Sequence, residues 1–422
     1  MPPGRPNAPC TTSPPEPWAG GPALTPSPTV IVAGAGIGGL TAALALARRG
    51  FRVSVLEQGE WLQETGAGIQ LSSNATRILI DLGLANALRL QAVAPTALCV
   101  RNAASGQEIV RMPLGEIAER RYGAPYWVIH RGDLQAALAD AVSGHPAITV
   151  RLGMRVENFL THSHGVRVLA NSPTGMAEER GLALLAADGL WSLARNRIGD
   201  GKPPRFAGRT AWRALVPADQ APRQCREPLV QLWLGRDAHL VHYPVKAGRI
   251  INVVVVTTDS WNAPGWSEPA AAAALIPRLT GEGWPPSALA LIRQPDGWLK
   301  WALYDRRPLR LWSHGAVALL GDAAHPMLPF LAQGAAMAIE DAAVAAHCLA
   351  RQPDDAASAL RAYCAMRCAR TARVQRLAAR NGARYHLSGV PGRLRDVAMR
   401  MIGGERLLHH YDWLYNWRPP AA

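Results

Sequence analysis

Lysine is nearly absent from this chain of 422 residues, so almost all of its formal net charge of +14 comes from arginine. The arginines are scattered, and their longest runs are pairs such as Arg48-Arg49 and Arg306-Arg307. Proteins that bind nucleic acid more often cluster basic residues on one element, with aromatic side chains between them. The sequence therefore predicts no nucleic-acid partner. A diffuse positive field instead favours anionic substrates and pyridine nucleotides.

Cysteine is also scarce, with six residues in the whole chain, and only Cys364 and Cys368 lie close together. One CxxxC spacing without a second pair or a histidine cluster does not predict a zinc site, so we expect no metal. We expect free thiols in a reducing cytosol.

Long apolar runs are missing too, because no stretch reaches the length needed to span a membrane. Residues 1–28 are rich in proline and lack the hydrophobic region of a secretory signal. They are expected to be a disordered tail or the result of a start codon assigned too early. These features predict a cytoplasmic protein without a membrane partner.

Residues 29–57 have the pattern of a βαβ unit. The apolar stretch 29–32 predicts a strand, the apolar periodicity of 40–49 predicts a helix, and 51–56 alternates as a second strand. The turn between the first strand and the helix has GxGxxG spacing. This unit predicts a dinucleotide site.

Four residues carry the chemistry of this unit. Gly34 allows the tight turn, Gly36 lets the backbone approach a pyrophosphate, and Gly39 permits close packing of helix on strand. The helix N-terminus offers free N–H groups and the positive end of its dipole to phosphates. Glu57 stands where a carboxylate can accept hydrogen bonds from ribose hydroxyls. The motif alone does not separate FAD from NAD, and a glycine-rich turn without any ligand is the structural alternative.

Two later segments each join an apolar strand to a short acidic turn. Residues 182–187 lead into Asp188-Gly189, and residues 316–320 lead into Gly321-Asp322. A single Asp-Gly pair is usually no more than a turn. Between residues 209 and 301 the sequence contains stretches in which apolar and polar residues alternate, such as HLVHYPV and RIINVVVVTT. These stretches predict an antiparallel sheet.

The predicted fold class is α/β (α+β), with a Rossmann-like dinucleotide domain, an inserted antiparallel sheet and a helical C-terminal segment. We assign residues 29–205 and 305–350 to the first domain and 206–304 to the sheet domain. Residues 351–422 form the helical segment, because 355–386 has a helical pattern.

Three separated stretches, VIVAGAGIGG (30–39), AADGLWSLAR (186–195) and LLGDAAHPMLPFLAQGAAMAIEDA (319–342), together resemble the flavin-contacting motifs of one family. It is the family of single-component, FAD-dependent aromatic hydroxylases, and the likeness is greatest to salicylate and 3-hydroxybenzoate hydroxylases. The resemblance runs from about residue 30 to residue 349. It implies bound FAD, with NADH or NADPH as a transient reductant.

The same resemblance implies further cofactor contacts. Asp188, with Ser192 and Arg195, matches the DG motif, which serves both FAD and the nicotinamide. Asp322 matches the GD motif, whose aspartate contacts the ribityl chain. Arg131 matches an arginine that contacts the flavin from the start of a helix.

Gln333, Gly334 and Ala335 mark the expected start of a long helix. Its N-terminus would direct N–H donors at the flavin pyrimidine edge, where they would stabilise the negative charge of the reduced flavin. The alternative is an ordinary helix start.

His239 and Tyr243 lie four residues apart on one predicted strand, so their side chains share a face. They resemble a His and a Tyr that meet the substrate in salicylate and 3-hydroxybenzoate hydroxylases. His239 could take a phenol proton near neutral pH. His242 should point the other way, and Arg213 is a candidate partner for a substrate carboxylate.

The sequence thus predicts an FAD-dependent monooxygenase that uses NAD(P)H and O2 to hydroxylate a small aromatic substrate, a hydroxybenzoate-like carboxylate, through a flavin C4a-hydroperoxide. We expect a monomer or homodimer. One alternative is an oxygenase of the same fold acting on a larger polycyclic or quinone-like substrate. Another is a flavoprotein that acts as a redox or interaction module without hydroxylase activity.

Overall fold

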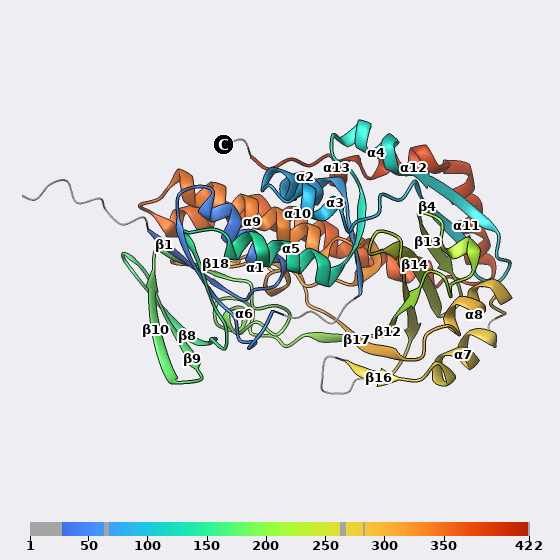
Figure 1. The fold of residues 1–422 in the computed structure, drawn as a ribbon, viewed down its shortest axis with the longest axis horizontal. Helices are drawn as coiled ribbons and strands as arrows, with labels where there is room; N and C mark the ends of the chain where they lie inside the picture. The colour runs from blue at the N-terminus through green and yellow to red at the C-terminus, as the bar shows by residue number, and fades with distance from the viewer. Residues whose placement is uncertain (1–27, 63–66, 262–266, 282, 421–422) are drawn as a thin grey trace, which may run out of the picture.

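The glycine turn follows the carboxyl end of β1 (Thr29–Ala33), a central strand of a six-stranded sheet that is mostly parallel (Figure 1). The computed structural model describes residues 28–62, 67–261, 267–281 and 283–420, so the predicted N-terminal tail lies outside the described residues except for Pro28. In spatial order the strands of this sheet are β18 (Ser313–His314), β19 (Val317–Leu319), β11 (Ala183–Ala186), β1 (Thr29–Ala33), β2 (Arg52–Leu56) and β7 (Ile148–Arg151).

The register of this sheet brings the three flavin-type motifs together. Ala33 at the end of β1 pairs with Ala186 at the end of β11, and Ala186 pairs with Leu319 at the end of β19. All three strands are parallel, so their carboxyl ends lie at one edge. Ligands of such sheets bind outside that edge. Motifs that are about 150 residues apart in the chain thus become neighbours.

A second sheet of eight strands confirms the predicted antiparallel layer. Its strands, in spatial order, are β16 (Glu268–Ala270), β17 (Trp298–Asp305), β12 (Arg205–Pro217), β15 (Ile250–Thr258), β14 (Ala238–Val245), β13 (Leu229–Leu234), β4 (Ala97–Asn102) and β5 (Glu108–Pro113). Strands β4 and β5 come from outside the range 206–304, and β13 pairs with β4 in parallel. The sheet therefore draws on a segment that the sequence placed with the dinucleotide domain. The domain boundaries themselves stay a prediction.

Two small sheets complete the strand content of the described residues. One is a hairpin array of β8 (Arg155–His162), β9 (Gly165–Ser172) and β10 (Gly175–Gly181), and the other pairs β3 (Gly68–Leu71) with β6 (Trp127–His130). The second pair leads directly into α5 (Arg131–Ser143), which places Arg131 at a helix start as expected.

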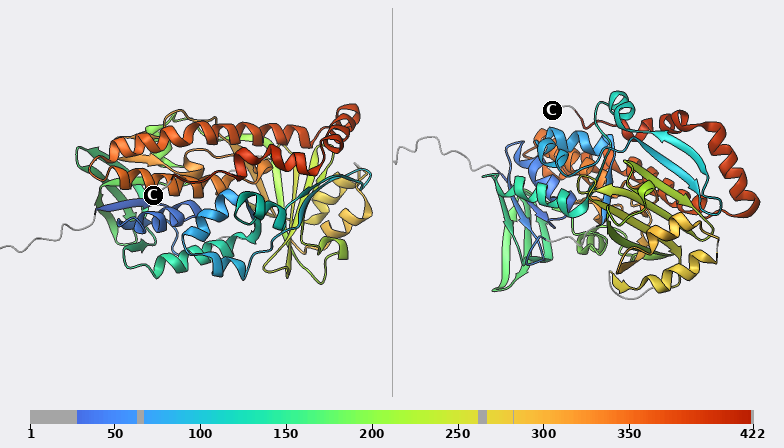
Figure 2. Two further views of the ribbon diagram at one scale, coloured as in Figure 1. Left: turned by 90° about the horizontal axis from the view of Figure 1, so that it is seen from above. Right: turned by 45° about the vertical axis from the view of Figure 1, so that its right-hand side comes forward.

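Helices cover the six-stranded sheet and continue along the molecule to the second sheet. The longest are α9 (Gly334–Arg351) and α10 (Ala356–Tyr385), which lie side by side (Figure 2). Besides α5, the others are α1 (Ile37–Ala47), α2 (Ser73–Asp81), α3 (Ala85–Arg89), α4 (Gly115–Tyr122), α6 (Leu193–Ile198), α7 (Ala272–Thr280), α8 (Pro286–Ile292), α11 (Gly389–Ile402), α12 (Gly404–His410) and α13 (Asp412–Tyr415).

The first helix begins earlier than the sequence predicted, at Ile37 rather than Leu40. Glycines have low helix propensity, so Gly38 and Gly39 hid the first turn of the helix. Gly39 is nevertheless part of α1. It lies so close to the glycine turn that a Cβ there would stand 1.9 Å from the carbonyl oxygen of Gly34. This close approach of helix and turn fits the role predicted for Gly39.

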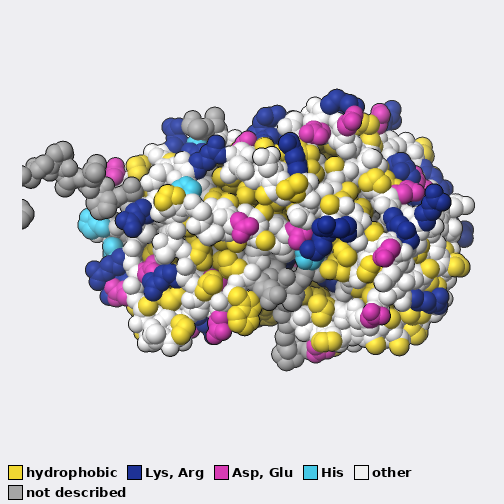
Figure 3. Space-filling view, viewed as in Figure 1, with side chains coloured by type: hydrophobic (Ala, Val, Ile, Leu, Met, Phe, Trp, Pro, Cys, Tyr) yellow, Lys and Arg dark blue, Asp and Glu magenta, His cyan; other side chains and the backbone are white. Residues whose placement is uncertain are grey.

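The surface agrees with the scattered pattern of arginines. On the face drawn in Figure 3, basic side chains are spread among acidic and apolar ones rather than gathered in one stripe. Of the helices that the structure describes, none is both long and apolar enough to cross a lipid bilayer. The five cysteines within the described ranges are free thiols.

Candidate active site

The glycine turn between β1 and α1 is shaped by close backbone contacts. Gly34 has a φ of +102°, and a Cβ there would lie 2.5 Å from the carbonyl oxygen of Ala187. Gly36 differs, because a Cβ there would meet no atom within 4 Å. The turn is therefore tight on its inner side and open at Gly36, directly at the N-terminus of α1, where a phosphate can approach the backbone.

Glu57 closes the far side of this turn at the end of β2. Its carboxylate accepts a hydrogen bond from the Ala35 N–H at 2.7 Å and another from the Gly59 N–H at 2.8 Å. A carboxylate has about four acceptor positions, so two remain for a ligand hydroxyl. This arrangement supports the role predicted for Glu57.

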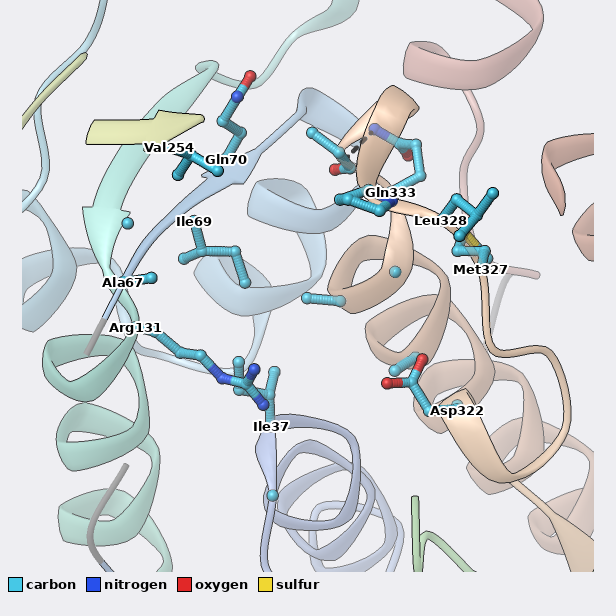
Figure 4. Close-up of a pocket in the computed structure, with 18 of the residues that line it drawn as sticks. Ile37, Ala67, Ile69, Gln70, Arg131, Val254, Asp322, Met327, Leu328 and Gln333 are labelled. Atoms are coloured by element: carbon cyan, nitrogen blue, oxygen red, sulfur yellow. Dashed lines mark hydrogen bonds between the residues drawn. The ribbon is translucent and has the colours of Figure 1, made fainter. Parts of the chain in front are cut away.

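A cavity of about 340 Å³ extends from the glycine turn to the second sheet. Figure 4 shows Arg131 and Asp322 pointing into it from opposite sides, with Gln333 farther along toward the second sheet. Its lining unites most of the predicted site residues, namely Gly36, Arg131, Asp322, Gln333, Gly334, Ala335, His239, Tyr243 and Arg213. The lining does not include Gly34, Gly39, Glu57 or Asp188.

The DG segment is anchored to the GD loop, and its Gly189 lines the cavity. Asp188 Oδ2 accepts from the Ala194 N–H at 3.2 Å, and Ser192 caps α6 by accepting from the Arg195 N–H at 2.9 Å. The buried Arg195 guanidinium donates to the carbonyl oxygen of Ala324 at 2.7 Å. Asp188 Oδ1 is buried and has no hydrogen-bond partner among the described residues.

A buried cluster of Asp341, His325 and Arg367 supports the GD loop. Asp341 on α9 accepts from the Gly321 N–H at 3.0 Å and contacts His325 Nε2 at 2.5 Å. Burial alone would raise the pKa of Asp341, but His325 and Arg367 lower it overall. His325 thus supports the turn.

Gln333 is held by the side chains of Ser72 and Asn74. Its amide nitrogen donates to Ser72 Oγ at 2.8 Å, and its amide oxygen accepts from Asn74 at 3.3 Å. Asn74 also donates to the buried Glu340 at 2.6 Å. The N-terminus of α9 is therefore fixed against that of α2, where Ser72 occupies the N-cap position.

His239 and Tyr243 both face the cavity from β14, as their spacing predicted. His242 points away and accepts from the Trp233 indole at 3.2 Å, which confirms its structural role. Burial, with smaller effects from His386 and Arg209, lowers the pKa of His239 well below its usual range. His239 is therefore neutral near pH 7 and able to accept a proton.

The sequence missed His386, whose ring nitrogen Nε2 lies 2.9 Å from His239 Nδ1. His386 is 147 positions from His239 in the chain, at the C-cap of α10. No local motif marks it. Only the packing of α10 against the second sheet brings the two rings together.

Tyr243 and Arg213 lie on adjacent parts of the cavity wall. Burial raises the pKa of Tyr243, opposed in part by the positive charge of Arg213, so its hydroxyl stays protonated. The Arg213 guanidinium lies 5.1 Å above the Trp301 ring. An arginine beside a phenol can hold an anionic group at this end of the cavity.

These features fit FAD when taken together. The open backbone at Gly36 and the N-terminus of α1 suit its pyrophosphate, and Glu57 suits its ribose. Arg131, Asp322 and the N-terminus of α9 supply charged and polar groups along the cavity. The donor set therefore matches a long, doubly anionic dinucleotide with a polar ring system.

The chain is similar to a family model and to proteins of known activity. The family model described as "FAD binding domain" matches residues 27–378. The chain is 37% identical over 390 residues to 3-hydroxybenzoate 6-hydroxylase 1 of Aquipseudomonas alcaligenes, with 92% of this chain and 96% of that protein covered. It is 39% identical over 399 residues to the 3-amino-4-hydroxybenzoate 2-monooxygenase PtnB3 of Streptomyces platensis, with 93% and 97% covered.

Solved structures agree with the curated relatives. A salicylate hydroxylase substrate complex superposes with a TM-score of 0.77 at 26% identity, covering 93% of this chain and 96% of that one. Klebsiella pneumoniae HpxO complexed with FAD and uric acid gives a TM-score of 0.79 at 27% identity, with 90% and 95% covered. The chain therefore belongs to the FAD-binding-domain family and is an FAD-dependent aromatic hydroxylase, a flavoprotein monooxygenase with NAD(P)H as its reductant.

Proposed function

We propose that this monooxygenase hydroxylates a small hydroxybenzoate-like carboxylate, with 3-hydroxybenzoate as the first candidate. The observation that carries the proposal is the shared cavity wall, where His239 and Tyr243 from β14 face the flavin-binding loop at Asp322 and Gln333. Relatives that act on 3-hydroxybenzoate and 3-amino-4-hydroxybenzoate cover more than nine-tenths of the chain and support this substrate class.

We assign three roles to the second sheet. Arg213 pairs with the substrate carboxylate, because it is the cation on that wall of the cavity. His239 accepts the phenolic proton, which raises the electron density of the ring where oxygen is added. Tyr243, still protonated, donates a hydrogen bond to the substrate and fixes its orientation.

The flavin end of the cavity has its own assignments. FAD, when bound, takes electrons from NAD(P)H and uses them to activate O2. We propose that Arg131 and Asp322 hold FAD in place, while the N-terminus of α9 at Gln333, Gly334 and Ala335 stabilises negative charge on the reduced ring. Apolar side chains on the cavity wall, including Val254, Val256 and Met327, keep water away from the reacting atoms.

A panel of hydroxybenzoates and hydroxynicotinates tests the proposal. For each compound, stimulated NADH and NADPH oxidation is compared with hydroxylated product formed. We expect a hydroxybenzoate to give near-equal amounts of oxidised cofactor and product. Coupled turnover only with a larger polycyclic or quinone-like substrate would favour the alternative substrate class. A cytoplasmic location and a monomeric or homodimeric state belong to the same proposal.

A further inference from the structure

Gln333 belongs to a closed ring of three side-chain hydrogen bonds at the start of α9. Ser72 Oγ donates to Asn74 Oδ1 at 2.6 Å, and Asn74 Nδ2 donates to Gln333 Oε1 at 3.3 Å. Gln333 Nε2 closes the ring by donating to Ser72 Oγ at 2.8 Å. All three side chains are buried, and of the three only Gln333 lines the cavity (Figure 4). The ring therefore meets a ligand through Gln333.

The carboxylate of Glu340 gives this ring its direction. It accepts from Asn74 Nδ2 at 2.6 Å, and Arg367 and Arg370 donate to it at 2.6 and 2.7 Å. A carboxylate held between two arginines has acceptors and no donors, so Asn74 must turn its NH2 group toward Glu340. The Asn74 oxygen then faces Ser72, whose hydroxyl donates to it.

The same direction passes on to the amide of Gln333. Because the Ser72 hydrogen is already used, the Ser72 oxygen can only accept, and Gln333 must present its nitrogen there. A reversed amide would place its oxygen against the Ser72 oxygen and its nitrogen against the Asn74 nitrogen. Both hydrogen bonds would be lost, and buried polar groups without partners are unfavourable. The buried carboxylate thus sets the orientation of this amide.

Ser72 serves the ring rather than the helix that it precedes. It is the N-cap residue of α2, but its side chain makes no capping hydrogen bond to any residue that the structure describes. Serine at an N-cap normally accepts from a backbone N–H of the first helical turn. A Ser72→Ala change therefore removes a member of the ring without removing a helix cap.

The donors and acceptors of the Gln333 amide leave one open position. Its nitrogen has two hydrogens, which serve Ser72 Oγ and, at 3.5 Å, the carbonyl oxygen of Ala332. Its oxygen has two lone pairs, and among the described residues Asn74 alone uses one of them. The amide can therefore accept one more hydrogen bond but has no hydrogen to offer.

We propose that Glu340, Asn74 and Ser72 form a positioning chain that fixes Gln333 as a hydrogen-bond acceptor for an N–H or O–H group of the ligand. Ser72 and Asn74 act through Gln333, so they are positioning residues. Two occupants of the cavity carry such a group, since the flavin ring has an N–H and a hydroxybenzoate has an O–H. The inference rests on the proposed function, because it takes FAD and a hydroxybenzoate as those occupants.

Four variants test the chain. Gln333→Met removes the amide at similar length, whereas Ser72→Ala keeps the amide but releases it from its fixed orientation. Asn74→Leu breaks the link to Glu340 and takes the place of Ser72→Ala if that protein does not fold. Ser143→Ala is the matched control, since Ser143 is an exposed serine at the end of α5. Thermal midpoints and FAD contents of the holoenzymes are measured first.

Paired ligands distinguish the two occupants. FAD is compared with 3-methyl-FAD by fluorescence titration of the FAD-free protein, and 3-hydroxybenzoate with 3-methoxybenzoate by flavin absorbance of the holoenzyme. In each pair, methylation removes the hydrogen that Gln333 would accept. The preference is the ratio of the two Kd values, which a general loss of stability does not change.

We expect the preference for one pair to fall about fivefold in both Gln333→Met and Ser72→Ala, and to keep its wild-type value in Ser143→Ala. The pair that responds identifies the occupant. Wild-type preferences for both pairs in Gln333→Met would overturn Gln333 as the acceptor. A fall in Gln333→Met without a fall in Ser72→Ala would overturn the positioning chain. If the wild-type protein binds no hydroxybenzoate, the proposed function fails, and the FAD pair alone decides the inference.

Discussion

Gly34 and Gly50 both adopt positive φ, at +102° and +87°, but only Gly34 is enclosed. A Cβ at Gly34 would collide with the Ala187 carbonyl oxygen, whereas at Gly50 it would meet nothing within 4 Å. We expect each alanine variant to lose about 1 kcal/mol of stability from backbone strain. Gly34→Ala should in addition weaken FAD binding at least about tenfold.

Titration of each apoprotein with FAD, followed by flavin fluorescence, compares the two variants. We expect Gly50→Ala to bind FAD with wild-type affinity. Equal affinities in the two variants would mean that the contact with Ala187 does not shape the phosphate site.

His239 gives the second prediction at this scale. Replacing it by asparagine should lower coupled turnover by about 10²- to 10⁴-fold, the range for loss of a general base. FAD content should not change, because His239 lies on the second sheet. Since the pKa of His239 is well below 6.5, wild-type turnover should not decline around pH 6.5 as an ordinary histidine base would make it. Unchanged coupled turnover in His239→Asn, on the best substrate, would rule out the assignment.

Individual site residues were predictable only where a local pattern marks them. Gly34, Gly36, Gly39 and Glu57 follow from one motif. The resemblance to the family marked His239 and Tyr243, and strand alternation predicted only that they share a face. The partners of these residues have no such pattern. His386 reaches His239 across 147 positions, and Ser72 reaches Gln333 across 261, so only the folded chain reveals them.

Helices α2, α9 and α10 are tied together through the buried Glu340. Its carboxylate accepts from Asn74 at 2.6 Å, from Arg367 at 2.6 Å and from Arg370 at 2.7 Å. Glu340→Gln leaves these groups in place but removes the negative charge between two arginines. We expect the free energy of unfolding to fall by about 3–5 kcal/mol, as for other broken buried ion pairs.

Glu116→Gln is the matched control for this charge removal. Glu116 pairs with Arg120 on the surface of α4 at 3.0 Å, and both side chains are largely exposed. An exposed pair contributes about 0–1 kcal/mol. Urea denaturation of both variants gives the comparison. Similar losses in the two proteins would contradict a supporting role for the buried cluster.

Elements were predicted well where the pattern is local. The long helix expected to start at residues 333–335 became α9, and the helical pattern at 355–386 became α10 within a few residues. The sheet between 209 and 301 also formed as expected. Membership of β4 in that sheet was not foreseen, because its parallel pairing with β13 joins residues about 130 positions apart. Such pairings depend on tertiary packing rather than on alternation along one strand.

The whole molecule should become less stable as pH falls below 6.5. His239 and His242 are buried as neutral rings, and burial lowers the pKa of His242 to about 3. The unfolded chain binds protons at these residues near pH 6.5, whereas the folded chain does not. Stability is therefore complete above pH 6.5 and is lost as pH falls, by up to about 1.4 kcal/mol per pH unit for each such ring.

Guanidinium unfolding at pH 7, 6 and 5 measures this dependence. Carboxylates with lowered pKa values, such as Asp341, change protonation only below their usual range near pH 3.8, so they do not contribute in this window. His242→Gln should give a shallower slope than the wild-type protein. Burial raises the pKa of Asp188 and of Asp322, which acts in the opposite direction, so the comparison with His242→Gln isolates the histidine. Equal slopes in the variant and the wild-type protein would show that His242 is not held neutral in the folded state.

We expect the enzyme to add one oxygen atom from O2 to a hydroxybenzoate bound in the cavity that joins the two sheets. Turnover of the holoenzyme with 3-hydroxybenzoate and NADH or NADPH under ¹⁸O₂ tests it directly by mass spectrometry of the product. We expect one ¹⁸O atom in each dihydroxybenzoate and close to one product for each reduced nicotinamide consumed. Oxidation of the nicotinamide to peroxide alone, with no labelled product from any hydroxybenzoate, would contradict it.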